Sequence, residues 1–266
     1  MITYRALGQR GRLGNQLYEL ASTYGIAQAR GEEPIFPADW IYRPFFRVPD
    51  RLFGPIPDTA VEAAEFAQHL DYRCRDYLQD INLFIDYLPT LRMFFQPSLH
   101  AAEHVPDLFS YFNLRETLGV HVRRGDNVVD PGVPNKADYH PPPSLAYYRR
   151  GIAHFSFVPH IVCVSDDIPW CRENIPAHFY SEGRAYFKEH EPEYGKAVPQ
   201  DWVDFFLLAQ CDYFVVTGST FGIWAALLAD VASSHVVRPN KVYGPLLSYI
   251  DSELLFDPRW EVISAA

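Results

Sequence analysis

The stretch TLGVHVRRGDN, residues 117–127, is a mostly apolar run that ends in two adjacent arginines and a Gly-Asp turn. Its first six residues are typical of a buried strand in a parallel sheet, where apolar residues follow one another with little polar interruption. Charged side chains at the end of a buried strand need partners of opposite charge. Arg123 and Arg124 therefore indicate a place where this chain meets negative charge.

Strand and helix patterns alternate on the C-terminal side of this stretch, which predicts a parallel sheet with helices on both faces. Ser144 is expected to cap the first of the helices. The uncharged stretch 213–229 is long enough for a membrane span, but its TGST turn breaks it into a strand and a helix. The strands are expected at 117–122, 160–165 and 213–217, and the helices at 144–155, 166–174, 201–211 and 219–229.

A second unit of this kind opens the chain. Residues 2–7 are expected to form a strand, the glycine-rich segment 8–15 a turn, and residues 15–30 a helix that ends at Gly31. The pattern from 32 to 115 is irregular. We predict an α/β fold with two Rossmann-like domains that face a cleft, 1–115 on the acceptor side and 116–266 on the donor side.

Composition narrows the class of protein. With 23 basic and 33 acidic residues, the net charge of −10 argues against wrapping nucleic acid or binding anionic lipid. Four cysteines without zinc-type spacing are expected to be reduced and buried. The first residues lack a secretory signal pattern, which predicts a cytoplasmic protein, with peripheral membrane association as the alternative.

Polar groups are expected to gather at one edge of the C-terminal sheet, because ligands of such folds bind beyond the carboxyl ends of the strands. An arginine fork matches phosphate oxygens, and a Gly-Ser-Thr turn that enters a helix offers backbone N–H groups and the positive end of a helix dipole. Together they predict a diphosphate-binding site. The residues at the three strand ends are Arg123 and Arg124, then Ser165, Asp166 and Asp167, then Gly218, Ser219, Thr220 and Phe221.

Each of these groups also has a structural explanation. Side chains alternate along a strand, so we assign phosphate binding to Arg123, on the face of His121, and an ion pair to Arg124, with Asp126 as a candidate partner. Asp166 and Asp167 are suited to accept hydrogen bonds from a guanine, and equally to cap a helix.

The glycine-rich segment near the N-terminus can likewise be explained by structure or by ligand binding. Gly11 and Gly14 are explained by a tight turn and Asn15 by a helix cap, whereas Arg12 has no evident structural role.

Four stretches in series resemble the α1,2-fucosyltransferases, glycosyltransferase family 11, and more distantly the α1,6- and protein O-fucosyltransferases. They are GRLGNQLYELA at 11–21, VHVRRGD at 120–126, VSDDIPWCREN at 164–174, and DFFLLAQCDYFVVTGSTFGIWAALL at 204–228. The resemblance implies a GT-B-type enzyme that transfers L-fucose from GDP-β-L-fucose, with inversion, to a glycan hydroxyl. The 2-OH of a terminal β-galactose is the acceptor that it favours, and it implies no metal and no cofactor beyond the donor.

The resemblance also assigns roles to residues by matching position. Arg123 would hold the β-phosphate and His121 would shape the donor pocket, while Ser219, Thr220 and Phe221 would line the diphosphate and guanine. Asp166 or Asp167 would recognise guanine by accepting its hydrogen bonds. Arg12 with Asn15 would close over the donor from the other domain. Asn127 departs from the family, where many members have Tyr after Gly-Asp. This difference concerns the contacts with the acceptor and not the binding of the donor.

Mechanistically, a guanidinium at the leaving diphosphate would replace Mg²⁺, and no D-x-D motif follows a strand. The general base is left open among Asp126, Asp130 and Glu19, and proton transfer without a strong base is an alternative. Two other functions stay open: α1,6-fucosyl transfer to GlcNAc-type acceptors, and nucleotide-sugar binding without catalysis. Aromatic side chains at Trp40, Tyr42, Phe45 and Phe46 are suited to stack on acceptor sugars, although core packing is the favoured explanation.

Overall fold

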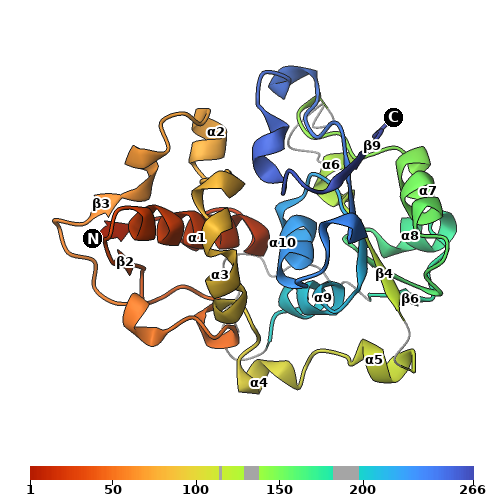
Figure 1. Cartoon of the computed structure of the whole chain (residues 1–266), viewed down its shortest axis with the longest axis horizontal. Coiled ribbons are helices and arrows are strands. Elements are labelled where there is room, and N and C mark those ends of the chain that lie inside the picture. Colours follow the sequence, from red (N-terminus) through yellow and green to blue (C-terminus); the bar gives the residue numbers. More distant parts are fainter. Residues whose placement is uncertain (114–115, 129–137, 182–197) are drawn as a thin grey trace. The chain divides into compact units, whose positions relative to one another are not determined.

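The computed structural model describes residues 1–113, 116–128, 138–181 and 198–266. These residues form two compact units: unit 1 is Met1–Glu103 together with Val198, and unit 2 holds the rest. Each unit contains a parallel β-sheet with helices (Figure 1), so the predicted α/β class with two Rossmann-like units is confirmed. Within the described ranges, no helix combines the length and apolar character needed to cross a membrane.

Unit 2 contains a six-stranded sheet in the order β6-β5-β4-β7-β8-β9, and all its strand pairs are parallel. The chain therefore starts at the centre with β4, moves outward through β5 and β6, and returns to add β7, β8 and β9 on the other side. This is the strand order of Rossmann folds, with a reversal between β4 and β7. The strands are β4 Thr117–Val122, β5 His160–Ser165, β6 Phe179–Tyr180, β7 Tyr213–Val215, β8 Val236–Pro239 and β9 Glu261–Ile263.

Helices cover both faces of β4, and the alternation of its side chains explains which helix lies where. Leu118, Val120 and Val122 pack in one apolar cluster with Tyr147 and Tyr148 of α7. On the other face, the missing side chain of Gly119 makes room for Leu208 of α9, since a Cβ there would lie 2.7 Å from the Leu208 Cδ1. The helices of unit 2 are α5 Leu108–Tyr111, α6 Gly125–Val128, α7 Leu145–His154, α8 Ile168–Asn174, α9 Gln200–Ala209 and α10 Thr220–Leu228.

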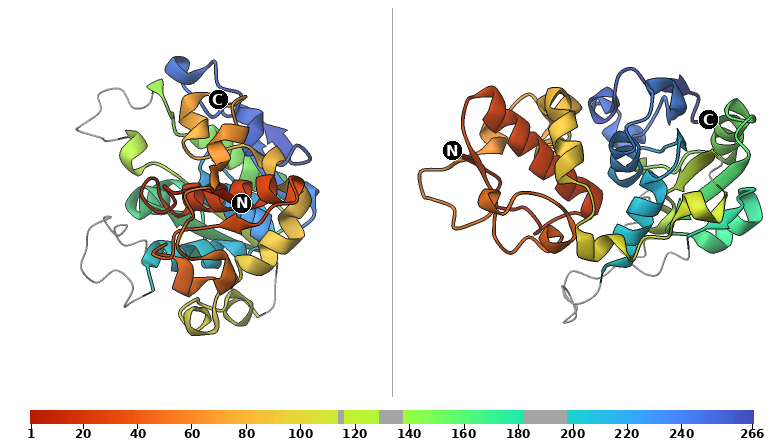
Figure 2. Two further views of the ribbon diagram at one scale, coloured as in Figure 1. Left: turned by 90° about the vertical axis from the view of Figure 1, so that its left-hand side faces the viewer. Right: turned by 60° about the horizontal axis from the view of Figure 1, so that its bottom comes forward.

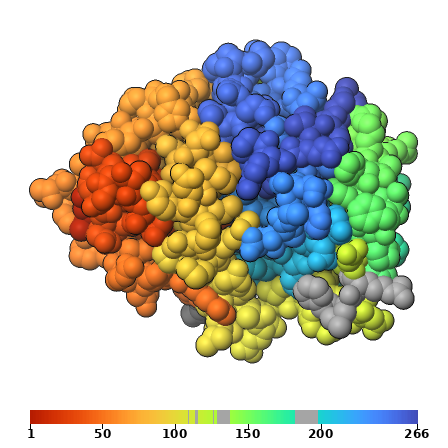
Figure 3. All heavy atoms as spheres, in the orientation of Figure 1, coloured from red at the N-terminus to blue at the C-terminus, as the bar shows by residue number. Residues whose placement is uncertain are grey.

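Helix α7 is also held by the C-terminal segment. Arg150 donates to the carbonyl of Ser264 at 2.6 Å, and the backbone N–H of Ser144 donates to the carbonyl of Ala265 at 3.1 Å. Figure 3 shows the two segments as adjoining green and dark blue surfaces. Ser144 caps α7 as predicted, because its Oγ accepts a hydrogen bond from the Tyr147 N–H at 3.1 Å.

Unit 1 is built around α1, Leu13–Ala29, which is buried on nearly all sides. Its sheet has the order β2-β1-β3, and each strand has only two residues: Ile2–Thr3, Pro34–Ile35 and Val61–Glu62. Figures 1 and 2 show α3, Leu88–Phe94, beside α1, and Tyr24 meets Phe94 edge to face at 5.3 Å between ring centroids. The other elements of unit 1 are α2 Tyr72–Arg75, α4 Leu99–Ala102 and the 3₁₀ helices η1 Arg43–Phe45, η2 Asp50–Leu52, η3 Ala63–Phe66, η4 Ile81–Leu83 and η5 Ile85–Tyr87.

Three expectations about local structure need correction. The first strand ends at Thr3 rather than at residue 7, because a turn follows in which the Leu7 N–H bonds the Tyr4 carbonyl at 3.2 Å. The helix begins at Leu13, so its N-cap residue is Arg12 and not Asn15, and the cap makes no side-chain hydrogen bond to the described residues. The strand expected at 213–217 ends at Val215.

The boundary between the units lies after Glu103, whereas the sequence predicted it after residue 115. Helix α5 explains the difference, since it packs on unit 2. The Leu108 N–H bonds the Gln210 side chain at 3.1 Å, and the Phe112 ring stacks on His160 at 4.5 Å between centroids.

Candidate donor-binding site

The reversal of strand order between β4 and β7 is the point where folds of this kind bind ligands. Beyond β4 the chain enters α6 through Arg123 and Arg124, and beyond β7 it enters α10 through the turn 216–219. Strand β5, the other neighbour of β4, pairs in register so that Val122 lies opposite Ser165. Residues after the two strands therefore lie side by side, and the polar clusters predicted from the sequence meet at one edge.

Asp166 is the centre of this edge. Its side chain is only 4% exposed and forms an ion pair with the Nη1 of Arg123. Its other oxygen accepts hydrogen bonds from the backbone N–H groups of Arg124 at 2.9 Å and Gly125 at 3.1 Å. Gly125 is needed for this approach, because a Cβ there would lie 2.4 Å from the Asp166 Oδ2. Asp166 thus fixes both the turn after β4 and the guanidinium of Arg123, a contact set that the sequence did not reveal.

Arg124 makes the ion pair that the sequence predicted for it, and its partner in the described residues is Asp167. The Nε of Arg124 lies 3.1 Å from the Asp167 Oδ2, and its guanidinium covers the Trp170 ring at 4.0 Å. Asp167 also caps α8, accepting from the Trp170 N–H at 3.2 Å. Both aspartates thus hold structural partners, as the capping and ion-pair explanations anticipated, and their role in reading guanine stays a prediction.

His121 lies beneath the start of α10. Its ring stacks on Phe221 at 5.3 Å between centroids, and its Nδ1 is 3.4 Å from the Thr217 Oγ1. Burial, reinforced by the positive charge of Arg123, lowers the pKa of His121 to about 3. The imidazole is therefore neutral at physiological pH. Gly222 lets the ring lie there, since a Cβ at that position would come within 2.5 Å of the Nδ1.

The turn before α10 is arranged around Thr217, whose Oγ1 accepts from the Ser219 N–H at 3.3 Å. Ser219 occupies the N-cap position of α10 but makes no side-chain cap bond within the described part of the chain. Thr220 and Phe221 form the first turn of the helix, so backbone N–H groups and the positive end of the dipole point to this edge. Tyr147 fixes the other side of the turn by donating to the Val216 carbonyl.

The remaining predicted residues fall outside this cluster. Arg12 and Asn15 belong to unit 1, where Arg12 is the N-cap of α1 and Asn15 accepts from Gln79 at 3.1 Å. Their closing over a donor stays a prediction. Asp126 lies in α6, with its side chain outside what the structure describes, and Asp130 lies outside the described residues.

Glu19, the third candidate base, is fully buried in unit 1. Neither carboxylate oxygen makes a hydrogen bond to the part of the chain that the structure describes. Burial raises its pKa to about 9, against smaller opposite effects of the Gly8 backbone N–H and Arg10. The group is a protonated acid at neutral pH, so it does not meet the requirement for a general base.

Chemically, the edge at β4 and β7 combines a fixed arginine, a helix N-terminus and a neutral buried histidine, which suits a phosphorylated ligand. Over residues 1–113, 116–128, 138–181 and 198–266, no group of three or more His, Cys, Asp or Glu side chains is placed to hold a metal ion. The TGST turn in the sequence could have suggested the close contact of Gly222 and the hydrogen bond of Ser219 to Thr217. The contacts of Asp166 could not be predicted in this way, because they depend on strand register.

Fold and site together define a Rossmann-type α/β protein with a polar edge suited to an anionic ligand at the switch point of its second unit. Residues 50–264 match the family described as Glycosyl transferase family 11. The chain is 31% identical, over 96% of its length and 73% of theirs, to the galactoside alpha-(1,2)-fucosyltransferases 1 of Leontocebus fuscicollis and Leontopithecus chrysomelas. The chain belongs to glycosyl transferase family 11, and the predicted resemblance is confirmed.

Two solved structures are also similar to this chain. One is a NodZ alpha-1,6-fucosyltransferase soaked with GDP-fucose, with a TM-score of 0.49 and 15% identity over 85% of this chain and 91% of that one. The other is the Arabidopsis thaliana FUT1 mutant R284K in complex with GDP, with a TM-score of 0.48 and 12% identity over 86% of this chain and 68% of that one.

Proposed function

We propose that this glycosyltransferase moves L-fucose from GDP-β-L-fucose to the 2-OH of a terminal β-galactose, with inversion and without a metal ion. Family membership and the activity named for its 31% identical relatives support the donor and the linkage. The observation that carries the proposal is the placement of Arg123 at the switch point, directly after β4 and held by Asp166.

Arg123 acts on the leaving group in this proposal. As the bond between the fucose C1 and the β-phosphate oxygen breaks, negative charge gathers on GDP, and a preorganised guanidinium stabilises that charge. The Asp166 ion pair keeps the guanidinium in place before the donor arrives, so little reorganisation is needed. The N-terminus of α10 adds further N–H donors for the diphosphate. His121, neutral and buried, contributes shape rather than charge.

The acceptor hydroxyl attacks C1 from the opposite side of the sugar and loses its proton as the new bond forms. Because Glu19 is already protonated, it cannot take up the proton of the acceptor hydroxyl, and we assign this role to Asp126. If proton transfer is late, solvent accepts the proton instead. A carboxylate base at position 126 predicts that Asp126→Asn lowers turnover and removes the acidic limb of the pH profile for kcat. An unchanged acidic limb in this variant supports transfer without a protein base.

Incubation with GDP-fucose and a panel of β-galactosides in EDTA, followed by linkage analysis of the product, tests the proposed function. We expect an α1,2-linked fucose, formed at the same rate with and without the chelator. A 6-linked product on GlcNAc-type acceptors supports the α1,6 alternative. Binding of GDP with neither transfer nor hydrolysis supports a non-catalytic role, and dependence on added Mg²⁺ contradicts the arginine mechanism.

A further inference from the structure

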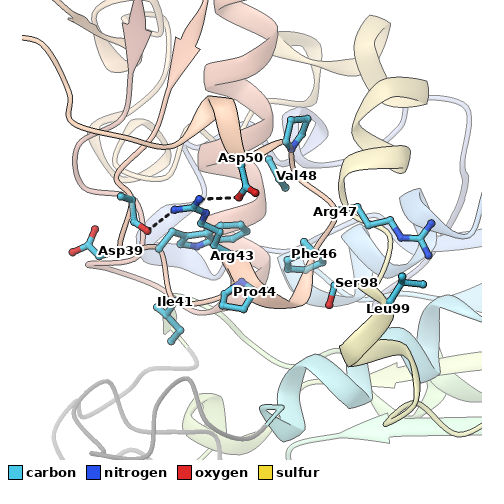
Figure 4. A pocket seen from close by; sticks show the side chains of 13 residues that line it. Asp39, Ile41, Arg43, Pro44, Phe46, Arg47, Val48, Asp50, Ser98 and Leu99 are labelled. Carbon is cyan, nitrogen blue, oxygen red and sulfur yellow. Dashed lines mark hydrogen bonds and ion pairs between the residues drawn. The ribbon is translucent and has the colours of Figure 1, made fainter.

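Unit 1 contains an open cavity of about 1010 Å³ that the donor-binding residues do not use. Its lining comes from the segment 38–50 and from Ser98 and Leu99 (Figure 4), all within unit 1. Pockets for small molecules commonly measure about 300–1,000 Å³, so this one is large enough for several sugar rings or a ligand of similar size.

The charged groups of this cavity are balanced and partly fixed. Arg43, Arg47, Asp39 and Asp50 are its charged lining residues, so the formal charge of the lining is zero. Arg43 bonds Asp50 at 2.7 Å and the Ala38 carbonyl at 3.2 Å, and Figure 4 marks both contacts. Arg47 donates through Nε to the Pro97 carbonyl at 2.7 Å. A guanidinium has five N–H donors, so these contacts leave further donors on both arginines for a ligand.

The rest of the lining is apolar except for Ser98. Trp40 stacks between Phe46 and Phe53, with interplanar angles of 4° and 8°. It is only 2% exposed, so the core-packing explanation of the aromatic residues is confirmed, and Trp40 and Phe46 contribute edges rather than open faces. Leu99, at 83% exposed, forms part of the rim.

This combination favours a neutral ligand rich in hydroxyl groups. A phosphate or nucleotide would need a surplus of positive charge, and the lining has none. An apolar partner would bury four charged side chains without giving them hydrogen bonds, which is costly. A sugar chain offers hydroxyls for the guanidinium and carboxylate groups, and C–H surfaces for the apolar wall. The lining chemistry is therefore that of an oligosaccharide site.

The cavity is joined by direct contacts to the glycine-rich loop that carries Arg12. The Trp40 Nε1 donates to the Gln16 Oε1 at 2.9 Å, and the Gln16 Nε2 donates to the Gly11 carbonyl at 3.2 Å. A Cβ on Gly8, whose φ is +82°, would come within 3.3 Å of the Trp40 ring. One indole therefore contributes to the cavity wall and also supports the loop.

We propose that this cavity binds the acceptor glycan through sugar residues other than the one that receives fucose. The inference rests on the proposed function for the class of its ligand. It makes Arg47 a determinant of acceptor specificity, with Arg43 held by Asp50 as a fixed part of the wall.

The test is titration of lacto-N-tetraose into the full chain in the absence of donor, followed by calorimetry or ligand-observed NMR. Arg47→Ala is expected to weaken binding by about tenfold or more, the loss typical of one hydrogen bond to a charged group. Arg51→Ala, an exposed arginine of the same segment outside the lining, is the matched control and is expected to bind like the wild type. Absence of binding by the wild type, or equal binding by both variants, overturns the proposal.

Steady-state kinetics separate this proposal from the proposed function. Arg47→Ala should raise the KM for lacto-N-tetraose while kcat, the KM for GDP-fucose and donor hydrolysis stay unchanged. The KM for methyl β-D-galactoside, which has a single sugar ring, should rise much less in this variant. Arg47-dependent glycan binding without any fucosyl transfer contradicts the function but supports the cavity. Transfer whose acceptor KM does not respond to Arg47→Ala overturns the cavity alone.

Discussion

The two units place their polar side chains by different means. In unit 2, six parallel strands run in register, so residues that follow β4, β5 and β7 meet at one edge with fixed partners such as Asp166. In unit 1 the strands have two residues each, and turns and 3₁₀ helices form a concave surface with balanced charge. Strand register holds one charge in a fixed place, as the proposed reaction requires, whereas turns form an open cavity, for which we propose a larger neutral ligand.

Two buried groups that are neutral at pH 7, one in each unit, respond to pH in opposite directions. Glu19 in unit 1 has a pKa raised to about 9 by burial, and His121 in unit 2 has a pKa lowered to about 3 by burial and by Arg123. The stabilising contribution of Glu19 is therefore lost as the pH rises, and that of His121 is lost as the pH falls.

Arg123→Ala gives the largest expected effect, because it removes the fixed charge at the leaving diphosphate. We expect kcat to fall by roughly 10²–10³ with the fold intact. Arg123→Lys should be nearly as damaging, since the planar fork is lost. Arg259→Ala is the control, as that arginine is 67% exposed and paired with Asp257 in the same unit. Turnover near the wild-type value in Arg123→Ala would refute the assigned role.

Glu19→Gln tests the buried acid of unit 1. Its pKa is raised from 4.5 to about 9 in the folded state, so its stabilising contribution is complete below pH 4.5 and is lost as the pH rises to about 9. At pH 7 the loss is about 3 kcal/mol, which glutamine avoids. Urea unfolding at pH 4.5 and 7 should show a smaller drop for Glu19→Gln than for the wild type. Equal drops would mean that Glu19 ionises freely.

His121 tests the opposite response in unit 2. Its depressed pKa means that the stabilising contribution is complete above pH 6.5 and is lost as the pH falls toward 3, by about 2 kcal/mol at pH 5. The imidazole C2–H resonance in NMR should therefore not titrate between pH 5 and 8. A midpoint near 6.5 for His121 would contradict its burial beneath α10.

Gly222→Ala has the smallest expected effect and tests the packing of α10 on His121. The new Cβ would meet the Nδ1 at 2.5 Å, so the ring or the helix must move. We expect a loss of about 1–2 kcal/mol in the free energy of unfolding, after the roughly 1 kcal/mol gained by alanine in a helix. Gly54→Ala, where the nearest atom is 3.8 Å away, should change it little. Similar losses for both variants would show that α10 does not depend on this contact.

The sequence predicted unit 2 better than unit 1 for a physical reason. Apolar runs such as 117–122 and 160–165, followed by polar residues, mark buried parallel strands and their ends, and the Ser144 cap acts within four residues of chain. Unit 1 is held by contacts between distant turns, such as that of Trp40 with Gln16, which leave no period in the sequence.

Within the site, the strand ends were predictable and the pairing of their side chains was not. Arg123 meets Asp166 because β4 and β5 align flush, and that register is a property of the folded sheet. The burial of Glu19 was missed for a similar reason, since α1 is covered on nearly all sides rather than along one stripe.

The central claim, that Arg123 at the β4–β7 switch point neutralises the leaving diphosphate, is tested most directly by an experimental structure of this chain with GDP-fucose. The account predicts β-phosphate oxygens at about 2.7–2.9 Å from the Arg123 guanidinium, which keeps its contact with Asp166. A diphosphate bound away from this edge, or a divalent cation between it and the protein, would contradict the account.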